Sequence, residues 1–258
     1  MAVSTLILLV LLFFFTSIIG VVTGSNSLVT VPVMFQFGID EKVAVATNMF
    51  GLTFMAIGGT IPFLRQGKIE YLKISPLVIL TVVSSAIGAL LVGLITNQSI
   101  KLIVSIAMIA VVIFTLLRSN GSEPPTVAGG LAFTSRSVIS LKVLTYVLTF
   151  IIGIYGGLYS GGYVTILTAV YAGFFGMTFT EAVASTKFLN VFSSAIASII
   201  FMWQGLVDYM LGTILAVTMF AGAYLGAHYV TKLHDLWIRR LFLTAVFLLA
   251  IKTRFDLI

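Results

Sequence analysis

Long runs of residues without charge organise this chain. Between successive Asp, Glu, Lys and Arg residues, these runs cover 1–39, 43–64, 74–100, 102–117, 143–180, 188–207 and 209–231, and a shorter apolar run covers 241–251. A helix that crosses a bilayer needs about 20 predominantly apolar residues. Most runs therefore suit one crossing, while the runs 1–39 and 143–180 are nearly twice as long as one helix requires.

The two longest runs each divide at a cluster of glycine and small polar residues. The clusters are Thr23-Gly24-Ser25-Asn26-Ser27 and Gly156-Gly157-Leu158-Tyr159-Ser160-Gly161-Gly162. Only about 13 apolar residues follow each cluster, too few to span a bilayer comfortably. The pattern predicts ten helical segments, eight of full length and two short. Their approximate spans are 4–23, 26–38, 42–64, 73–96, 99–118, 142–160, 163–175, 179–203, 207–231 and 236–255.

The composition favours a membrane protein and excludes a soluble globular one. Of the 258 residues, 60% are apolar and 9% are charged, whereas a soluble domain carries roughly 25% charged residues. The sequence contains no cysteine, which excludes thiolate catalysis and cysteine-based metal sites. Its net charge of +6 fits anchoring of one face beside anionic membrane lipid. No nucleic-acid motif accompanies this charge, so no nucleic-acid partner is expected.

The chain contains an internal repeat of five segments. Four pairs of short motifs recur in the same order, at offsets of 133, 139, 138 and 138 residues. They are Ile18-Ile19-Gly20-x-x-x-Gly24 with Ile151-Ile152-Gly153-x-x-x-Gly157, Ala46-Thr47-Asn48 with Ser185-Thr186-Lys187, Gln66-Gly67-Lys68 with Gln204-Gly205-Leu206, and Ser85-Ala86-Ile87-Gly88 with Ala223-Tyr224-Leu225-Gly226. We expect residues 1–118 to form the first transmembrane repeat, 119–141 a linker loop and 142–258 the second repeat.

The basic residues indicate that the two repeats are inverted in the membrane. In the first repeat, three follow the third segment and one follows the fourth: Arg65, Lys68, Lys73 and Lys101. In the second repeat, none lies after the third segment and three follow the fourth: Lys232, Arg239 and Arg240. Because cytoplasmic loops are enriched in Lys and Arg, this reversal predicts opposite orientations and places both termini outside the cytoplasm.

The sequence therefore predicts an all-α, polytopic integral membrane protein with two inverted five-segment repeats, each containing a short, broken half-helix. Matching short segments in inverted repeats indicate the binding site of a transporter. A helix that begins inside the bilayer presents unpaired N–H groups and a positive dipole end, which together suit an anion. Ser25, Asn26, Ser27, Ser160 and Thr165 add polar side chains at the two breaks. Close helix packing is the alternative explanation for the glycines.

Lys187 is the basic residue that lies well inside a predicted segment. It sits about eight residues from the segment's start, roughly 12 Å along a helix, and Thr186 and Asn190 flank it. A buried ammonium in a membrane is costly and marks a candidate functional group; the alternative is a side chain that snorkels towards the interface. In the repeat, its counterpart is the neutral amide of Asn48.

The acidic residues and histidines indicate neither a metal nor a cofactor. Asp40, Glu41 and Glu181 stand at segment starts, where capping of a helix dipole is favoured over proton coupling. His228 and His234 are six residues apart, which does not match the i, i+4 spacing of a zinc-binding pair. We expect no metal site and no cofactor.

The motifs together resemble the TauE/SafE sulfite exporter family. The resemblance covers roughly residues 15–255 and rests on Leu28-Val29-Thr30-Val31-Pro32, Ala46-Thr47-Asn48, Gly67-Lys68-Ile69-Glu70, Gly153-x-x-Gly156-Gly157-x-x-Ser160-Gly161-Gly162, Ser185-Thr186-Lys187 and Gly205-Leu206-Val207-Asp208. Members typically have a denser first glycine run and a serine where Asn48 stands. The resemblance implies a non-enzymatic carrier that exports sulfite, or a related small sulfur-containing anion, across the cytoplasmic membrane by alternating access.

Carried over to this chain, the resemblance places both breaks and the Thr47 and Thr186 steps at one substrate site. The predicted substrate-binding residues are Gly24, Ser25, Asn26, Ser27, Thr47, Asn48, Ser160, Gly161, Gly162, Thr186, Lys187 and Asn190. A carrier of an organosulfonate, thiosulfate or another small oxyanion, including an importer, remains an alternative. An anion channel and an intramembrane serine protease using Ser160 are further alternatives. The oligomeric state is left open, a homo-oligomer included.

Overall fold

The computed structural model describes residues 3–24, 26–67, 69, 71–119, 135–230 and 232. Over these residues the fold is entirely helical, as predicted. The helices are α1 (Val3–Thr23), α2 (Ser27–Gln36), α3 (Glu41–Arg65), α4 (Tyr71–Leu94), α5 (Asn97–Ser119), α6 (Ser135–Leu158), α7 (Tyr163–Phe174), α8 (Phe179–Trp203) and α9 (Tyr209–Val230).

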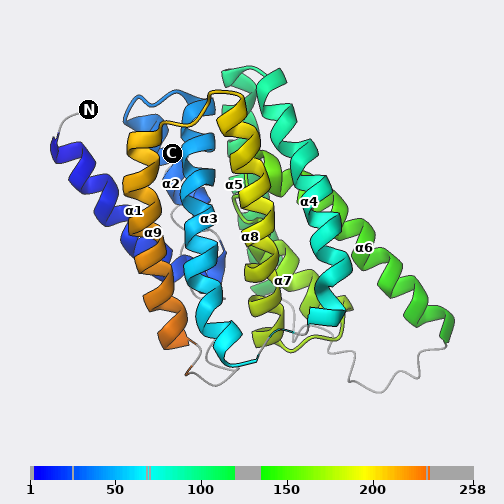
Figure 1. Ribbon diagram of the computed structural model, residues 1–258. Helices are drawn as coiled ribbons and strands as arrows, with labels where there is room; N and C mark the ends of the chain where they lie inside the picture. The colour runs from blue at the N-terminus through cyan, green and yellow to red at the C-terminus, as the bar shows by residue number, and fades with distance from the viewer. Residues whose placement is uncertain are drawn as a thin grey trace.

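The helices pack in pairs that correspond between the two halves. The central helices α3 and α8 lie against each other; α9 packs on α3 and carries α1, while α4 packs on α8 and carries α6. If each helix is replaced by its counterpart in the other half (α1 by α6, α3 by α8 and α4 by α9, and the reverse), the same set of contacts results. In Figure 1, α1 and α6 slope away on opposite sides, and corresponding helices such as α3 and α8 run in opposite directions. Inverted repeats are expected to show this relation.

Glycines let the outer helix of each half approach its neighbour closely. A Cβ atom on Gly222 would lie 2.6 Å from the carbonyl oxygen of Phe14, and one on Gly226 would meet that of Ile18. In the corresponding contact between α4 and α6, a Cβ on Gly88 would meet the carbonyl oxygen of Ile154. The packing interpretation is thus confirmed for Gly222 and Gly226. Small residues allow main chains to approach in this way in membrane bundles.

Capping residues fix where the two central helices begin. The side chain of Asp40 accepts hydrogen bonds from the backbone N–H groups of Lys42 and Val43 at the start of α3. At the start of α8, Thr178 and Glu181 form a reciprocal capping box. The capping roles predicted for Asp40 and Glu181 are confirmed. Glu41 instead forms an ion pair with Lys101 of α5, at 2.7 Å.

The helix ends also recur between the halves. Gly38 follows α2 and Gly176 follows α7, and Gly67 and Gly205 follow α3 and α8; all four have positive φ. Each pair is 138 residues apart. A residue in the left-handed conformation just beyond a helix is a common terminator, usually glycine because it lacks a Cβ atom.

The lengths of most predicted segments agree with the structure, with one correction. Six described helices are long and apolar enough to cross a membrane, namely α1, α3, α4, α6, α8 and α9, and α2 and α7 are short as predicted. The predicted start of the sixth segment at 142 is wrong, because α6 begins at Ser135. The rest of the predicted linker and the tenth segment, 236–255, lie outside the described residues.

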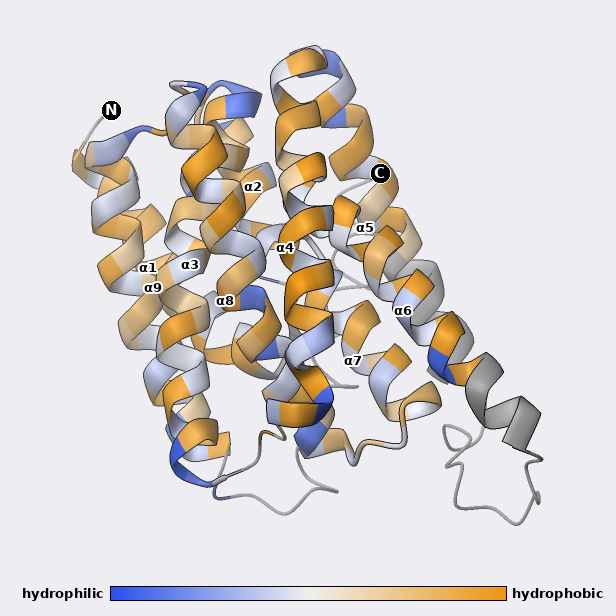
Figure 2. Ribbon diagram, turned by 45° about the vertical axis from the view of Figure 1, so that its right-hand side comes forward, coloured by the Kyte–Doolittle hydropathy of each residue, from blue (hydrophilic) through white to orange (hydrophobic). Residues whose placement is uncertain are grey.

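The outer surface is apolar along the length of the helices. Leu72, Leu94 and Trp203 are more than four-fifths exposed, and Figure 2 shows hydrophobic residues over the helices with hydrophilic ones gathered towards both ends. In water such a surface would drive association. In a bilayer, the helices satisfy their own backbone groups and the apolar side chains contact lipid.

Candidate functional site

The two breaks lie against each other inside the bundle. The hydroxyl of Tyr159, in the second break, donates a hydrogen bond to the carbonyl oxygen of Ser27 at 2.9 Å. A Cβ atom on Gly24, in the first break, would lie 2.5 Å from the Cβ atom of Val164 in α7. Residues 132 and 140 positions apart in the sequence are therefore brought into direct contact.

The breaks share a backbone conformation. Gly24 has φ +66° and Ser160 has φ +65°, and Ser160 is the non-glycine residue with positive φ among those described. These two residues are 136 apart, as are the first residues of α2 and α7. Neither Asn26 nor Gly162, the residues before these helices, caps the helix with a described side-chain hydrogen bond. At α7 the first N–H, that of Tyr163, donates to the carbonyl oxygen of Ser160 at 3.2 Å, so the backbone itself contributes to the start of this helix.

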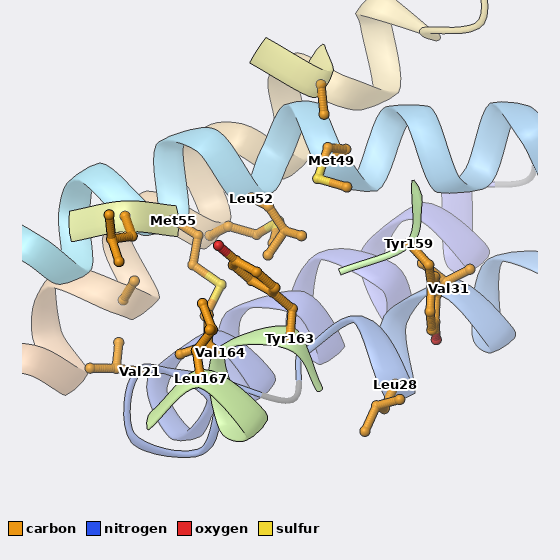
Figure 3. Close-up of a cluster of buried hydrophobic side chains, with 14 of the residues drawn as sticks. Val21, Leu28, Val31, Met49, Leu52, Met55, Tyr159, Tyr163, Val164 and Leu167 are labelled. Atoms are coloured by element: carbon orange, nitrogen blue, oxygen red, sulfur yellow. The ribbon is translucent and has the colours of Figure 1, made fainter. Parts of the chain in front are cut away.

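A small cavity lies where the breaks meet α3 and α8. Its volume is about 10 Å³, roughly the space of one water molecule. Three of its apolar lining residues, Leu52 and Met55 of α3 and Val164 of α7, belong to the buried cluster drawn in Figure 3. The residues that line the cavity are Gly20, Gly24, Asn26, Ser27, Leu52, Met55, Ser160, Val164, Lys187 and Asn190.

Lys187 supplies the charged side chain of the cavity lining. It is 2% exposed, and its Nζ atom donates a hydrogen bond to the carbonyl oxygen of Gly20 at 2.8 Å. The snorkelling alternative is wrong, because the head group is buried and contacts α1 from the other half of the chain. No carboxylate is among the described lining residues, so nothing described there neutralises a lysine ammonium.

Two amides complete the polar lining. The Oδ1 atoms of Asn26 and Asn190 are buried and accept no hydrogen bond from a described group. The Nδ2 atom of Asn26 donates to the sulfur of Met55 at 3.5 Å, a weak acceptor. Buried polar atoms are usually paired, so two unpaired acceptors at one cavity indicate a place for a ligand or water.

Six of the predicted binding residues meet at this cavity, and Asn48 supports one of them. The six are Gly24, Asn26, Ser27, Ser160, Lys187 and Asn190. The Nδ2 atom of Asn48 donates to Ser27 Oγ at 2.9 Å, and its Oδ1 atom accepts from Thr30 Oγ1 at 2.8 Å. Asn48 therefore holds the start of α2 in place, although it is not itself among the residues that line the cavity.

The remaining predicted residues have other partners. Thr47 Oγ1 accepts a hydrogen bond from the backbone N–H of Asp208 at 3.0 Å, which ties α3 to the start of α9. The hydroxyl of Thr186 lies 2.9 Å from that of Thr168 and links α8 to α7. Gly161 and Gly162 form the backbone of the second break, where the carbonyl oxygen of Gly161 accepts from the hydroxyl of Tyr155. Ser25 lies outside the described residues.

Four lining residues were not predicted from the sequence. Leu52, Met55 and Val164 are apolar residues in apolar segments, and no pattern distinguishes them from the core. Gly20 carried a usable signal, since it stands one helical turn before Gly24 in the first repeat motif.

The serine-protease alternative gains no support from this geometry. Ser160 lines the cavity, but His228 lies in the last turn of α9 and is exposed. His234 lies outside the described residues.

Comparisons with known proteins assign the chain to a family. It is 25% identical over 216 residues to a probable membrane transporter protein, ORF9, of Sinorhizobium sp, covering 84% of this chain and 79% of that protein. It is 24% identical over 255 residues to the probable membrane transporter protein YfcA of Escherichia coli K12, covering 97% and 91%. No solved structure gives a significant match. The family described as Sulfite exporter TauE/SafE matches residues 9–253, and the chain therefore belongs to this family of membrane transporters.

Proposed function

We propose that this transporter exports sulfite, or a related small sulfur-containing anion, across the cytoplasmic membrane by alternating access. One observation carries the proposal: the buried Lys187 ammonium lies between two helix breaks with no carboxylate among the described cavity residues. The family membership supports a transporter and, through its description, a sulfur oxyanion. The repeat supports a mechanism in which one half moves against the other.

The cavity contacts suggest how an anion would be held. Lys187 would exchange the carbonyl oxygen of Gly20 for an anion oxygen, and the hydroxyls of Ser27 and Ser160 would donate alongside it. A charge-assisted hydrogen bond is roughly twice as strong as a neutral one, which favours the exchange. The Gly20 carbonyl would accept the ammonium again when the anion leaves.

The small cavity fits a closed state of such a carrier. A volume of about 10 Å³ holds one water molecule but not a sulfur oxyanion. Loading therefore requires the two breaks, or the facing surfaces of α3 and α8, to separate. A carrier that must open and close for each anion saturates at high substrate concentration and turns over slowly compared with a channel.

The decisive test is sulfite flux into proteoliposomes that contain the purified protein. Lys187→Ala is expected to lower the rate at least tenfold, because it removes the cavity's charge. Lys142→Ala is the matched control, since Lys142 is an exposed lysine of α6, and its rate should equal that of the unaltered protein. Equal rates for Lys187→Ala and Lys142→Ala would contradict the site. A rate no higher than in protein-free liposomes for the unaltered protein would contradict the substrate.

A further inference from the structure

The charge of the cavity limits the charge of its ligand. Lys187 contributes at most +1, and no other charged side chain is among the described lining residues. A monoanion would make the loaded site neutral, whereas a dianion would leave a net negative charge in the middle of the membrane. If Lys187 were neutral, the imbalance of a dianion would be larger still. Because uncompensated charge in a membrane is costly, the cavity favours a monoanion.

The unpaired amide oxygens add a second requirement. Oδ1 of Asn26 and Oδ1 of Asn190 are acceptors, and both side chains are 4% exposed and line the cavity. A ligand that offers only acceptor oxygens would leave both unpaired. A ligand with an O–H group can donate to one of them, while its other oxygens accept from Lys187 and Ser160.

We propose that the site selects the singly protonated form of a divalent oxyacid, hydrogen sulfite for a sulfite carrier, over the dianion and over sulfonates without an O–H group. The inference rests on the proposed function and deepens it. Hydrogen sulfite has one negative charge for Lys187, oxygens that accept from the hydroxyls, and an O–H for an asparagine oxygen. Each anion exported would then carry one proton out of the cell, without a separate proton site in the protein.

Among the described residues of the second break and of the helices that flank it, α6 and α7, the phenols are the buried titratable groups. Tyr159 and Tyr163 belong to the second break and the start of α7, and Tyr155 and Tyr171 to α6 and α7. Phenols carry no charge in the neutral range. The charged residues of α3, α4 and α8 other than Lys187 lie in the first or last turns of these helices: Glu41, Lys42, Arg65, Lys73 and Glu181. A pH change across the neutral range therefore acts at the cavity on the substrate and on Lys187.

The first experiment varies pH at constant total sulfite. Expressed per total sulfite and corrected for protein-free liposomes, the initial rate should rise about tenfold per pH unit lowered through the alkaline range, as the hydrogen sulfite concentration does. Methanesulfonate, a monoanion without an O–H group whose charge is constant over this range, reports titration of Lys187. Its inhibition of sulfite flux should be weak and should change much less with pH than sulfite flux does.

Three outcomes are distinguishable. A rate that is constant or falls as the pH is lowered overturns the inference but leaves the proposed function standing. Methanesulfonate inhibition that follows the same pH profile as sulfite flux also overturns it, because the pH dependence would then belong to Lys187. No sulfite flux at any pH contradicts the proposed function itself.

The second experiment tests the amide acceptors. In Asn190→Leu, sulfite flux should fall at least tenfold while methanesulfonate inhibits as in the unaltered protein, because methanesulfonate has no O–H to donate. Asn190→Ser keeps an acceptor oxygen and should retain part of the flux, which guards against a variant that fails to fold. Gln98→Leu changes an exposed amide of α5 and is the control. Equal losses of sulfite flux and methanesulfonate inhibition in both Asn190 variants would overturn the assignment.

Discussion

Gly24 and Ser160 hold the same backbone conformation at corresponding points of the two breaks, yet only one of them is glycine. For Gly24, φ is +66° and a Cβ atom would lie 2.5 Å from Val164 Cβ. A non-glycine residue in this conformation costs about 1–2 kcal/mol, and the clash adds to this. Gly24→Ala should therefore lower the melting temperature in detergent by several degrees, measured by intrinsic fluorescence.

Ser160 differs because its side chain is already accommodated. Ser160→Gly relieves the strained φ but makes the unfolded chain more flexible, so its melting temperature should stay near that of the unaltered protein. Its sulfite flux should fall about three- to tenfold, from the loss of one hydrogen bond.

Gly173→Ala is the stability control, since its Cβ would meet nothing within 4 Å. A Gly24→Ala variant as stable as Gly173→Ala would contradict the strain argument.

Single residues of the site were predictable where they carry a charge or interrupt an apolar run. Lys187 and the break residues stood out because lipid offers no partner for an ammonium or for an unpaired N–H group. Leu52, Met55 and Val164 were not predictable, since their role depends only on which helix faces they occupy. Thr47 matched the family motif, but in the structure its hydroxyl oxygen accepts a hydrogen bond from the backbone N–H of Asp208, just before α9, a long-range contact that no local pattern reveals.

At the scale of helices, the outer helices α1 and α6 each pack closely against a helix of the other half, α9 and α4, at a glycine. A Cβ atom on Gly88 would meet the carbonyl oxygen of Ile154 in α6, and one on Gly226 would meet that of Ile18 in α1. Overpacking of a close contact costs about 1–3 kcal/mol. Gly88→Ala and Gly226→Ala should each lower the melting temperature by a similar amount relative to Gly173→Ala. If either variant has the same melting temperature as Gly173→Ala, the contact between that pair of helices is looser than described.

The short helices show why element boundaries were harder to predict than element order. α2 has 10 residues and α7 has 12, so the repeat offset changes from 136 at the breaks to 138 at Gly38 and Gly176. The sequence motifs paired Gly24 with Gly157, whereas the backbone pairs it with Ser160. Glycines recur every four residues there, and only the backbone conformation distinguishes one from the next. The start of α6 at Ser135 was not predicted, because the expected boundary was taken from the start of the apolar run and the helix extends beyond that run.

Across the whole molecule, the ends of the helices separate the described charges into two groups. In Figure 1, α3 ends and α4 begins at the bottom of the view, and α9 also ends there; these helix ends carry Arg65, Lys73 and Lys232. Lys42 stands at the opposite end of α3, and Lys101 lies there too because it pairs with Glu41. From the positive-inside rule we expect the first group to face the cytoplasm.

This orientation can be tested directly because the sequence contains no cysteine. Gln66, just after α3, and Gln98, in the first turn of α5, are both exposed and belong to opposite ends of the bundle. In intact cells, a membrane-impermeant maleimide should label Gln98→Cys, while Gln66→Cys should react only after the membrane is permeabilised. Sulfite flux of each variant serves as the control for folding. Labelling of Gln66→Cys alone in intact cells would reverse the orientation. Labelling of both would contradict a membrane-spanning α4, because α4 is the helix that lies between the two positions. The expected pattern places Lys187 between a basic cytoplasmic face and a less basic outer face, so that an anion leaving the cell passes from the more attractive side through one buried charge.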